Sequence, residues 1–77
     1  MRTRILSIVS QTQNNGVYIT TVRINRVIRS TSGSITLPDR TVLRFAPPQN
    51  GGRVTSMIVI TSNAPIVPPF NVDLRLD

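Results

Sequence analysis

The sequence lacks most of the side chains on which enzymes and metal sites depend. It contains no cysteine and no histidine, and it has neither glutamate nor lysine. Without cysteine or histidine, the chain has no disulfide framework, no thiolate zinc site and no imidazole general base. Its only carboxylate side chains are Asp39, Asp73 and Asp77. We therefore expect a protein that is not an enzyme, with no cofactor, no metal and no small-molecule substrate.

Long apolar runs are absent as well. A membrane-spanning helix needs about 20 consecutive apolar residues, and no run in this chain approaches that length. Near the N-terminus, Ser7 and Ser10 interrupt an apolar stretch that is too short for a secretory signal. We expect neither a membrane partner nor a targeting segment.

Residues that favour β-structure dominate what remains. Valine, isoleucine and threonine make up 27 of the 77 residues; they pack well on a pleated surface and lose side-chain freedom in helices. Good helix formers are scarce, whereas six prolines and four glycines interrupt the chain at short intervals. The composition predicts an all-β fold in which residues 1–77 form one small domain. We expect a β-sandwich or barrel of about six short strands, with a Pro-rich extended segment before the last strand.

Turn signals divide the chain into these strands. Asn15-Gly16 is typical of a type I′ hairpin turn, because both residues tolerate positive φ. Pro38-Asp39 fits the centre of a type I turn, since proline presets φ. The strands are predicted over residues 3–12, 17–28, 34–37, 41–46, 53–61 and 70–77.

The first two strands carry more detailed expectations. The apolar residues between Ile5 and Val9 predict a mostly buried first strand. In the second strand the apolar phase changes at Thr20-Thr21, which predicts a β-bulge, and a second slip is expected near Asn25-Arg26. A helix over residues 22–28 is the alternative, because two isoleucines lie four residues apart there.

The last strand and the segment before it suggest contact with a neighbour. The segment is rich in proline and is typical of an extended arm or a crossover. The strand alternates apolar and polar residues, which predicts a half-buried strand at a sheet edge. Exchange of this strand between copies would supplement a thin core, and the alternative is that it closes the chain's own sheet. The candidate assembly arm comprises Pro65, Pro68, Pro69, Phe70, Val72 and Leu74.

Arginine is the unusual feature of the composition. All nine basic residues are arginine, and the formal net charge is +6. A guanidinium grips carboxylate or phosphate through two parallel hydrogen bonds. Five arginines lie within residues 1–38, where there is no acid, and an arginine stripe across the predicted hairpin is geometrically reasonable, with Arg26 joining it if the predicted bulge forms. The candidate contacts for a polyanion or an acidic partner are Arg2, Arg4, Arg23, Arg26 and Arg29, and the unspecific alternative is a solvated basic face.

Two functions fit these features. The first is a non-enzymatic structural or assembly subunit, concretely a small virion component such as a capsid decoration or tail-associated protein. Its partners would be copies of itself, in a homo-oligomer, or a larger protein assembly. The alternative is a basic β-barrel that binds nucleic acid through phosphate contacts, although few aromatic residues are present to stack on bases. We favour assembly, and a virion location over a cytoplasmic one.

One stretch carries a likeness to a known family. The chain reads Gly33-Ser34-Ile35-Thr36-Leu37-Pro38, then Arg40, then Gly51-Gly52-Arg53-Val54. This pattern resembles the swapped-hairpin DNA-binding domains of bacterial transition-state regulators, and the resemblance implies a short helix after the strand. Pro47-Pro48 and the β-branched Thr41-Val42 oppose that helix, and Gly-Gly stands where the family has Gly-Asp. No site residue is carried over.

Overall fold

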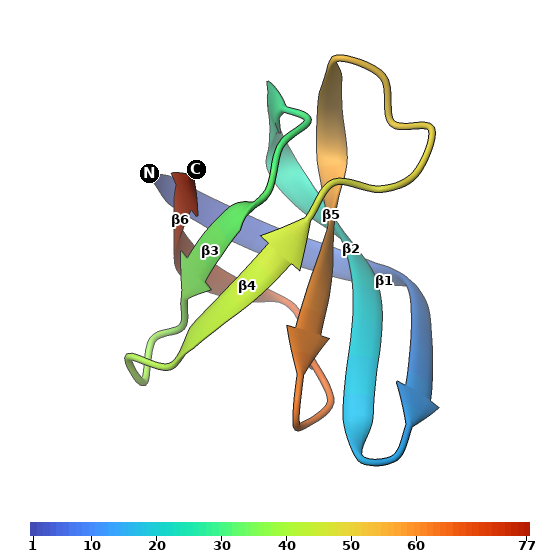
Figure 1. The fold of residues 1–77 in the computed structure, drawn as a ribbon. Helices are drawn as coiled ribbons and strands as arrows, with labels where there is room; N and C mark the ends of the chain where they lie inside the picture. The colour runs from blue at the N-terminus through green and yellow to red at the C-terminus, as the bar shows by residue number, and fades with distance from the viewer.

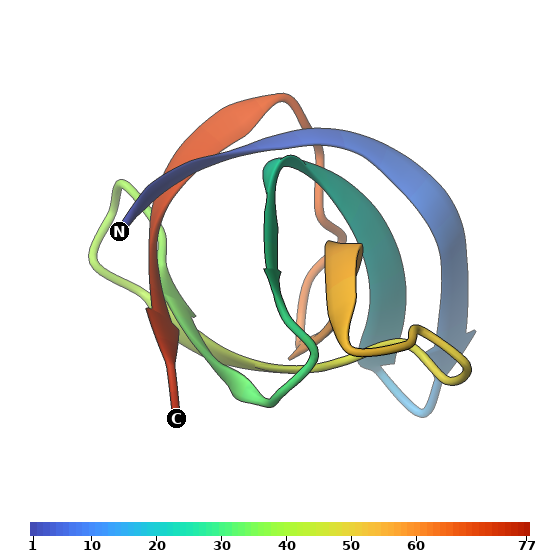
Figure 2. The ribbon, with the colours of Figure 1, turned by 90° about the horizontal axis from the view of Figure 1, so that it is seen from above.

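Six antiparallel strands close into a small barrel in the computed structural model, which describes all of residues 1–77 (Figures 1 and 2). The strands are β1 (Arg2–Asn14), β2 (Val17–Arg29), β3 (Gly33–Thr36), β4 (Val42–Ala46), β5 (Val54–Ser62) and β6 (Phe70–Leu76). Around the barrel they run β1-β2-β5-β4-β3-β6, and β6 pairs with β1. The structure contains no helix, so the all-β prediction is confirmed and the form is a barrel.

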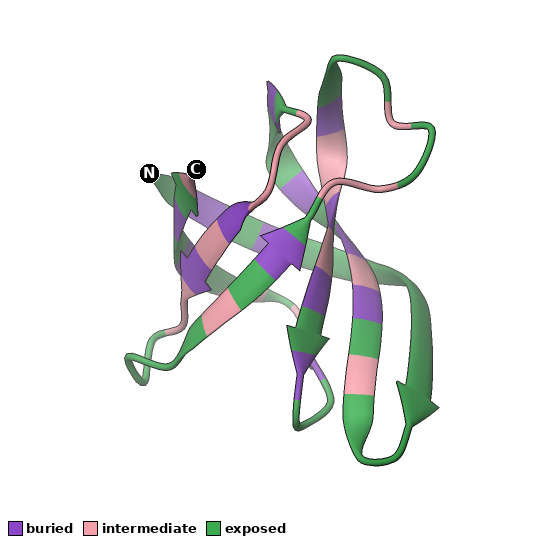
Figure 3. Ribbon diagram, in the orientation of Figure 1, coloured by how far each residue is buried: buried purple, intermediate pink, exposed green.

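The core is built from one face of each strand and one loop residue. Buried and exposed residues alternate along the strands in Figure 3 because successive side chains point to opposite faces. Seven of the eleven buried apolar residues are isoleucine, whose branched side chain packs well on a pleated surface. The core consists of Ile5, Val22, Ile24, Ile28, Ile35, Phe45, Ile58, Ile60, Ile66, Val72 and Leu74.

The turn between β1 and β2 has the predicted form. Asn15 and Gly16 have φ values of 54° and 79°, and Asn14 pairs directly with Val17. A two-residue loop with positive φ at both positions is a type I′ turn. The prediction from Asn15-Gly16 is therefore confirmed.

The bulge expected at Thr20-Thr21 is wrong. The pairing of β2 with β5 runs without interruption from Tyr18 to Arg23, and the extra residues of the first hairpin lie on β1. They fall at Leu6 and Val9, where β1 advances two residues while β2 advances one. The apolar pattern gave a false signal because Thr20 faces the interior, whereas Val17 and Ile19, on the other face of β2, are exposed.

The second slip in β2 is confirmed. The register with β5 shifts between Arg23 and Ile28, so this part of β2 contains residues with no partner on β5. The alternative helix over residues 22–28 is excluded, because the whole stretch belongs to β2.

The first strand is less buried than its composition predicts. Ile5 is buried, but Leu6 and Ile8 are each 40% exposed and Val9 is 49% exposed. The reason is that β6 pairs with β1 only from Arg2 to Ile5. Beyond that point β1 continues with β2 as a long hairpin (Figure 1).

The β3–β4 connection is the predicted tight turn. Arg40 donates its backbone N–H to the carbonyl of Leu37 at 2.9 Å, with Pro38 and Asp39 between them. The chain then returns directly as β4, so the short helix implied by the resemblance to the swapped-hairpin family is not formed.

The last strand alternates as predicted but is not an edge. Val72 and Leu74 are buried, whereas Asn71 and Asp73 are exposed. Because β6 pairs with β1 on one side and with β3 on the other, it closes the chain's own barrel. The segment between β5 and β6 brings Ile66 into the core.

Gly33 provides a test of this packing. A Cβ atom at Gly33 would overlap the backbone oxygen of Arg75 and lie 2.8 Å from Cζ of Phe45. Gly33→Ala is therefore expected to lower the free energy of unfolding by about 1–3 kcal/mol, as overpacked core positions do. Urea denaturation followed by circular dichroism measures the change. Ser34→Ala, on the other face of β3, is the control and should have little effect; equal stability of the two variants would contradict the prediction.

Candidate interaction surfaces

The three carboxylates are poorly suited to proton transfer. Asp39 accepts a hydrogen bond from the backbone N–H of Thr41 at 3.0 Å, and this bond lowers the pKa of Asp39. The N-terminal ammonium, 2.7 Å from Asp73, lowers the pKa of that carboxyl in the same way. All three carboxylates therefore remain charged at neutral pH, the third being Asp77 beside Arg44. A general acid needs the opposite shift. No three histidine, cysteine, aspartate or glutamate side chains lie together in a group that could hold a metal ion.

Three of the predicted arginines come together at the start of β1. Arg2 and Arg4 point outward, since the residues between and after them, Thr3 and Ile5, are the buried ones. Arg26 reaches across from β2 and donates a hydrogen bond to the carbonyl of Arg2 at 2.8 Å. We call Arg2, Arg4 and Arg26 the N-terminal arginine cluster.

Two asparagines hold this cluster in place. Asn25 accepts the backbone N–H of Arg4 through its Oδ1 at 2.9 Å, and Asn71 accepts from Nη1 of Arg4 at 3.2 Å. Their side chains line a shallow polar depression of about 270 Å³ together with Arg2, Thr3 and Arg4. The depression contains no apolar side chain, so it suits a charged or strongly polar group.

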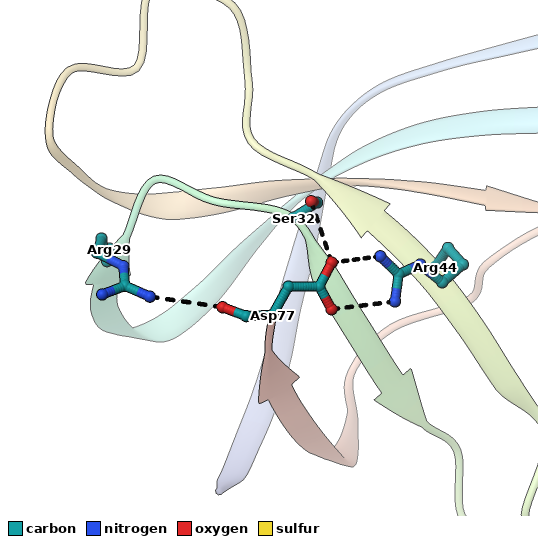
Figure 4. Close-up of polar contacts among 4 residues, drawn as sticks. All are labelled: Arg29, Ser32, Arg44 and Asp77. Carbon is teal, nitrogen blue, oxygen red and sulfur yellow. Dashed lines mark hydrogen bonds and ion pairs between the residues drawn. The ribbon is translucent and has the colours of Figure 1, made fainter.

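The other two predicted arginines lie elsewhere. Arg23 is exposed farther along the hairpin, where it pairs with Ser7 and Met57. Arg29 ends β2, beyond the irregular segment, and its Nη2 lies 3.5 Å from the backbone oxygen of Asp77 (Figure 4). Neither Arg23 nor Arg29 lines the polar depression, and the register shift in β2 lies between these two residues.

A second charged group surrounds the C-terminus and was not predicted. Arg44 donates two hydrogen bonds to the Asp77 carboxylate, from Nη1 to Oδ1 at 3.2 Å and from Nη2 to Oδ2 at 2.5 Å (Figure 4). The Ser32 hydroxyl donates to Oδ2 at 3.2 Å. The Arg44 hydrogen bonds are the main cause of the lowered pKa of Asp77. Sequence reasoning missed this pair because β4 and the C-terminus meet only through β3.

Most of the positive charge is not neutralised within the chain. The structure contains two ion pairs, Met1 with Asp73 and Arg44 with Asp77. Only one of the nine arginines takes part, so the other eight guanidinium groups form no ion pair with an aspartate side chain. This surplus charge attracts anions and acidic surfaces.

The far half of β1 has an open side. From Leu6 to Asn14 this strand pairs with β2 alone, and no other segment lies along its outer side in Figures 1 and 2. We call this side the free β1 edge. Residues 5–22, which include the edge, contain no charged side chain. The exposed apolar residues within residues 5–22 are Leu6, Ile8, Val9, Val17 and Ile19.

The candidate assembly arm is divided between the core and the surface. Val72 and Leu74 are buried in the chain's own barrel, and Phe70 packs against that core. Contact with a neighbour through these residues therefore requires exchange of β6. The three prolines lie in the connection from β5 to β6, whose Val67 is 76% exposed. A depression of about 350 Å³ lies beside it, lined by Leu37, Pro38, Asp39, Pro65, Ile66, Val67 and Phe70.

No protein-family model, curated protein or solved structure matches this chain. The structure also holds no helix of the length and apolar character needed to cross a membrane.

Protonation of Asp77 is expected to weaken the fold. Because the pKa of Asp77 is below its ordinary value of 3.8 in the folded chain, its stabilising effect is complete above that value. The effect is lost as the pH falls through the lowered pKa. Asp77→Asn should therefore have a lower Tm than the unmodified protein at about pH 7, and this difference should shrink at a second pH well below 3.8.

Calorimetry at the two pH values measures this difference. The general effect of acid on a basic protein is shared by both chains and cancels in the comparison. A difference in Tm that stays constant with pH would show that the charge of Asp77 does not contribute.

Proposed function

We propose that this protein is a non-enzymatic assembly subunit whose β1–β2 hairpin and exposed arginines contact other protein chains. The observation that carries the proposal is the free β1 edge. It presents nine residues, from Leu6 to Asn14, that have a pairing strand on one side only. An exposed strand edge offers unpaired backbone donors and acceptors to another chain.

The composition of this edge supports the same conclusion. Soluble proteins usually protect an exposed edge with charged residues, proline or bulges. Here the bulges at Leu6 and Val9 disturb only the first part of the edge. The remainder has neither charge nor proline. A core of eleven apolar residues is also small, and association is a common way for small domains to bury more surface.

The narrower form of the proposal is a small virion component, such as a capsid decoration or a tail-associated protein. Its support is the small all-β domain combined with an edge suited to repeated contacts between subunits. Mass spectrometry of purified particles from the source tests this form. Recovery of the protein only from fractions without particles would count against the virion location and leave assembly itself open to the test below.

Self-association can be measured directly. Light scattering after size-exclusion chromatography is expected to give a mass above the 8.5 kDa of one chain, rising with protein concentration. The physical reason is that only another chain can pair with the backbone groups of the edge and cover the exposed apolar residues of the hairpin. A single species of 8.5 kDa at tens of micromolar, with no assembly partner in the source particle, would contradict the proposal.

A second candidate function, polyanion binding, is favoured by the N-terminal arginine cluster. None of its three guanidinium groups forms an ion pair with an aspartate, and Arg2 and Arg4 line the polar depression together with Asn25 and Asn71. Phosphate oxygens fit such a site. Binding of single-stranded nucleic acid usually adds stacking on several aromatic rings. This chain has only Tyr18, Phe45 and Phe70, and Phe45 is buried.

Salt dependence separates this function from unspecific attraction. Arg4→Gln is expected to weaken binding to a DNA or RNA duplex and to reduce the slope of log affinity against log salt by about 0.9, the value for one phosphate contact. Arg53→Gln removes the same charge outside the cluster and is the matched control. Fluorescence anisotropy over a salt series measures both slopes. Equal slopes for the two variants, or no binding by the unmodified protein, would exclude the cluster as a phosphate site.

A further inference from the structure

We infer that the free β1 edge pairs with the same edge of a second copy of this chain, antiparallel, about a two-fold axis at Thr12. The inference rests on the proposed assembly function and names its first partner. Its basis is the direction of the backbone groups along β1, the register that this direction allows and the distribution of charge.

Hairpin geometry determines which backbone groups of β1 face outward. Residues that flank a two-residue loop form a hydrogen-bonded pair, and hydrogen-bonded and non-hydrogen-bonded pairs alternate from there. Since Asn14 flanks the loop opposite Val17, Asn14 and Thr12 direct their N–H and C=O groups toward β2. Gln11 and Gln13 direct theirs to the free side. The side chain of Gln11 agrees with this placement: it reaches Thr20, its partner on β2, as close side chains of a non-hydrogen-bonded pair do.

These outward groups determine the register of the pairing. If Thr12 of one copy lies opposite Thr12 of the other, Gln11 of each copy lies opposite Gln13 of its partner. Each of these two pairs exchanges two hydrogen bonds, so all the outward groups of Gln11 and Gln13 are satisfied. Identical strands that meet antiparallel have this two-fold symmetry, and the contact closes as a dimer.

The bulges on β1 limit the contact to one segment. From Ser10 to Asn14 the pairing with β2 has no irregularity, whereas the bulges at Leu6 and Val9 bend the strand before it. Five residues of each copy can therefore align as regular strands. The side chains that meet are threonine, glutamine, serine and asparagine, which form favourable neutral pairs across strands.

The distribution of charge favours a second copy as the occupant. Two chains that each carry +6 repel one another wherever arginines come face to face. Residues 5–22 form one of two long stretches without charge, the other being residues 54–72, and pairing at Thr12 keeps the N-terminal arginine clusters of the two copies at the far ends of their β1 strands. A strongly acidic partner would instead be drawn to the arginines.

Disulfide formation tests the register. In the dimer the two copies of residue 12 form a non-hydrogen-bonded pair with Cα atoms about 4.5 Å apart, within reach of a disulfide. Because the chain has no cysteine, Thr12→Cys introduces a single thiol. Mild oxidation is expected to convert most of this variant into a covalent dimer.

Thr61→Cys is the matched control. Thr61 is exposed and pairs with Ile19, which pairs in turn with Thr12, so Thr61 lies in the same row but two strands from the edge. Equal cross-linking of both variants would contradict the inference.

A proline substitution tests the edge itself. Gln13→Pro removes one outward N–H and leaves the hydrogen bonds between β1 and β2 unchanged, so the barrel should fold while the dimer is lost. Gln13→Ala retains the N–H and is expected to remain dimeric. Light scattering measures the mass, and circular dichroism checks that Gln13→Pro is folded.

The outcomes separate this inference from the proposed function. An oligomer that persists in Gln13→Pro overturns the β1 pairing and leaves assembly through another surface. A monomeric unmodified protein overturns the self-pairing, and assembly then depends on the source particle alone. If Gln13→Pro does not fold, hydrogen exchange of the unmodified protein decides. The amides of Gln11 and Gln13 should exchange more slowly as protein concentration rises, and exchange independent of concentration overturns the inference.

Discussion

Closure of the barrel by β6 is the interaction on which the rest of the structure depends. Residues 2–5 of β1 pair with residues 70–73 of β6, and β6 in turn pairs with β3. This arrangement buries Ile5, Val72 and Leu74 together and brings the N-terminal ammonium to Asp73. Since the pairing ends at Ile5, it also determines where β1 leaves the barrel and where its open side begins. The same ladder therefore organises both the core and the surface available for contact.

The closed end and the open hairpin differ in electrostatic character. Arg2 and Arg4 lie on the part of β1 that β6 covers, with Arg26 across from them, whereas the hairpin beyond Ile5 has no charge until Arg23. A barrel of this size buries few residues, so the outward-facing residues of its strands determine the charge and polarity of most of its surface. The molecule thus presents a basic end and a neutral hairpin.

Local patterns predicted the turns well and the strand partners poorly. The Asn15-Gly16 and Pro38-Asp39 turns follow from the conformational preferences of single residues, so the sequence alone identifies them. The alternation in β6 identified its inward face. By contrast, the arrangement that covers both sides of β6 and leaves β1 open depends on contacts between residues some 70 positions apart, such as Thr3 with Val72.

The candidate surfaces show the same division between local and distant information. The prediction grouped Arg2 and Arg4 with Arg26 from the first hairpin alone, and it included Arg23 and Arg29 in the same group. The ion pair of Arg44 with Asp77 depends on strand order and was missed. Apolar composition likewise placed Ile8 and Val9 in the core, because hydrophobicity does not reveal that a strand has left the barrel wall.

The location of the single tyrosine has a practical consequence for spectroscopy. Tyr18 is the only tyrosine in the chain, and there is no tryptophan. Tyr18 pairs with Gln13 near the tip of the hairpin. Its near-ultraviolet absorption and emission therefore report on the surroundings of the hairpin tip, while the barrel interior, filled mainly by aliphatic side chains, contributes almost no optical signal.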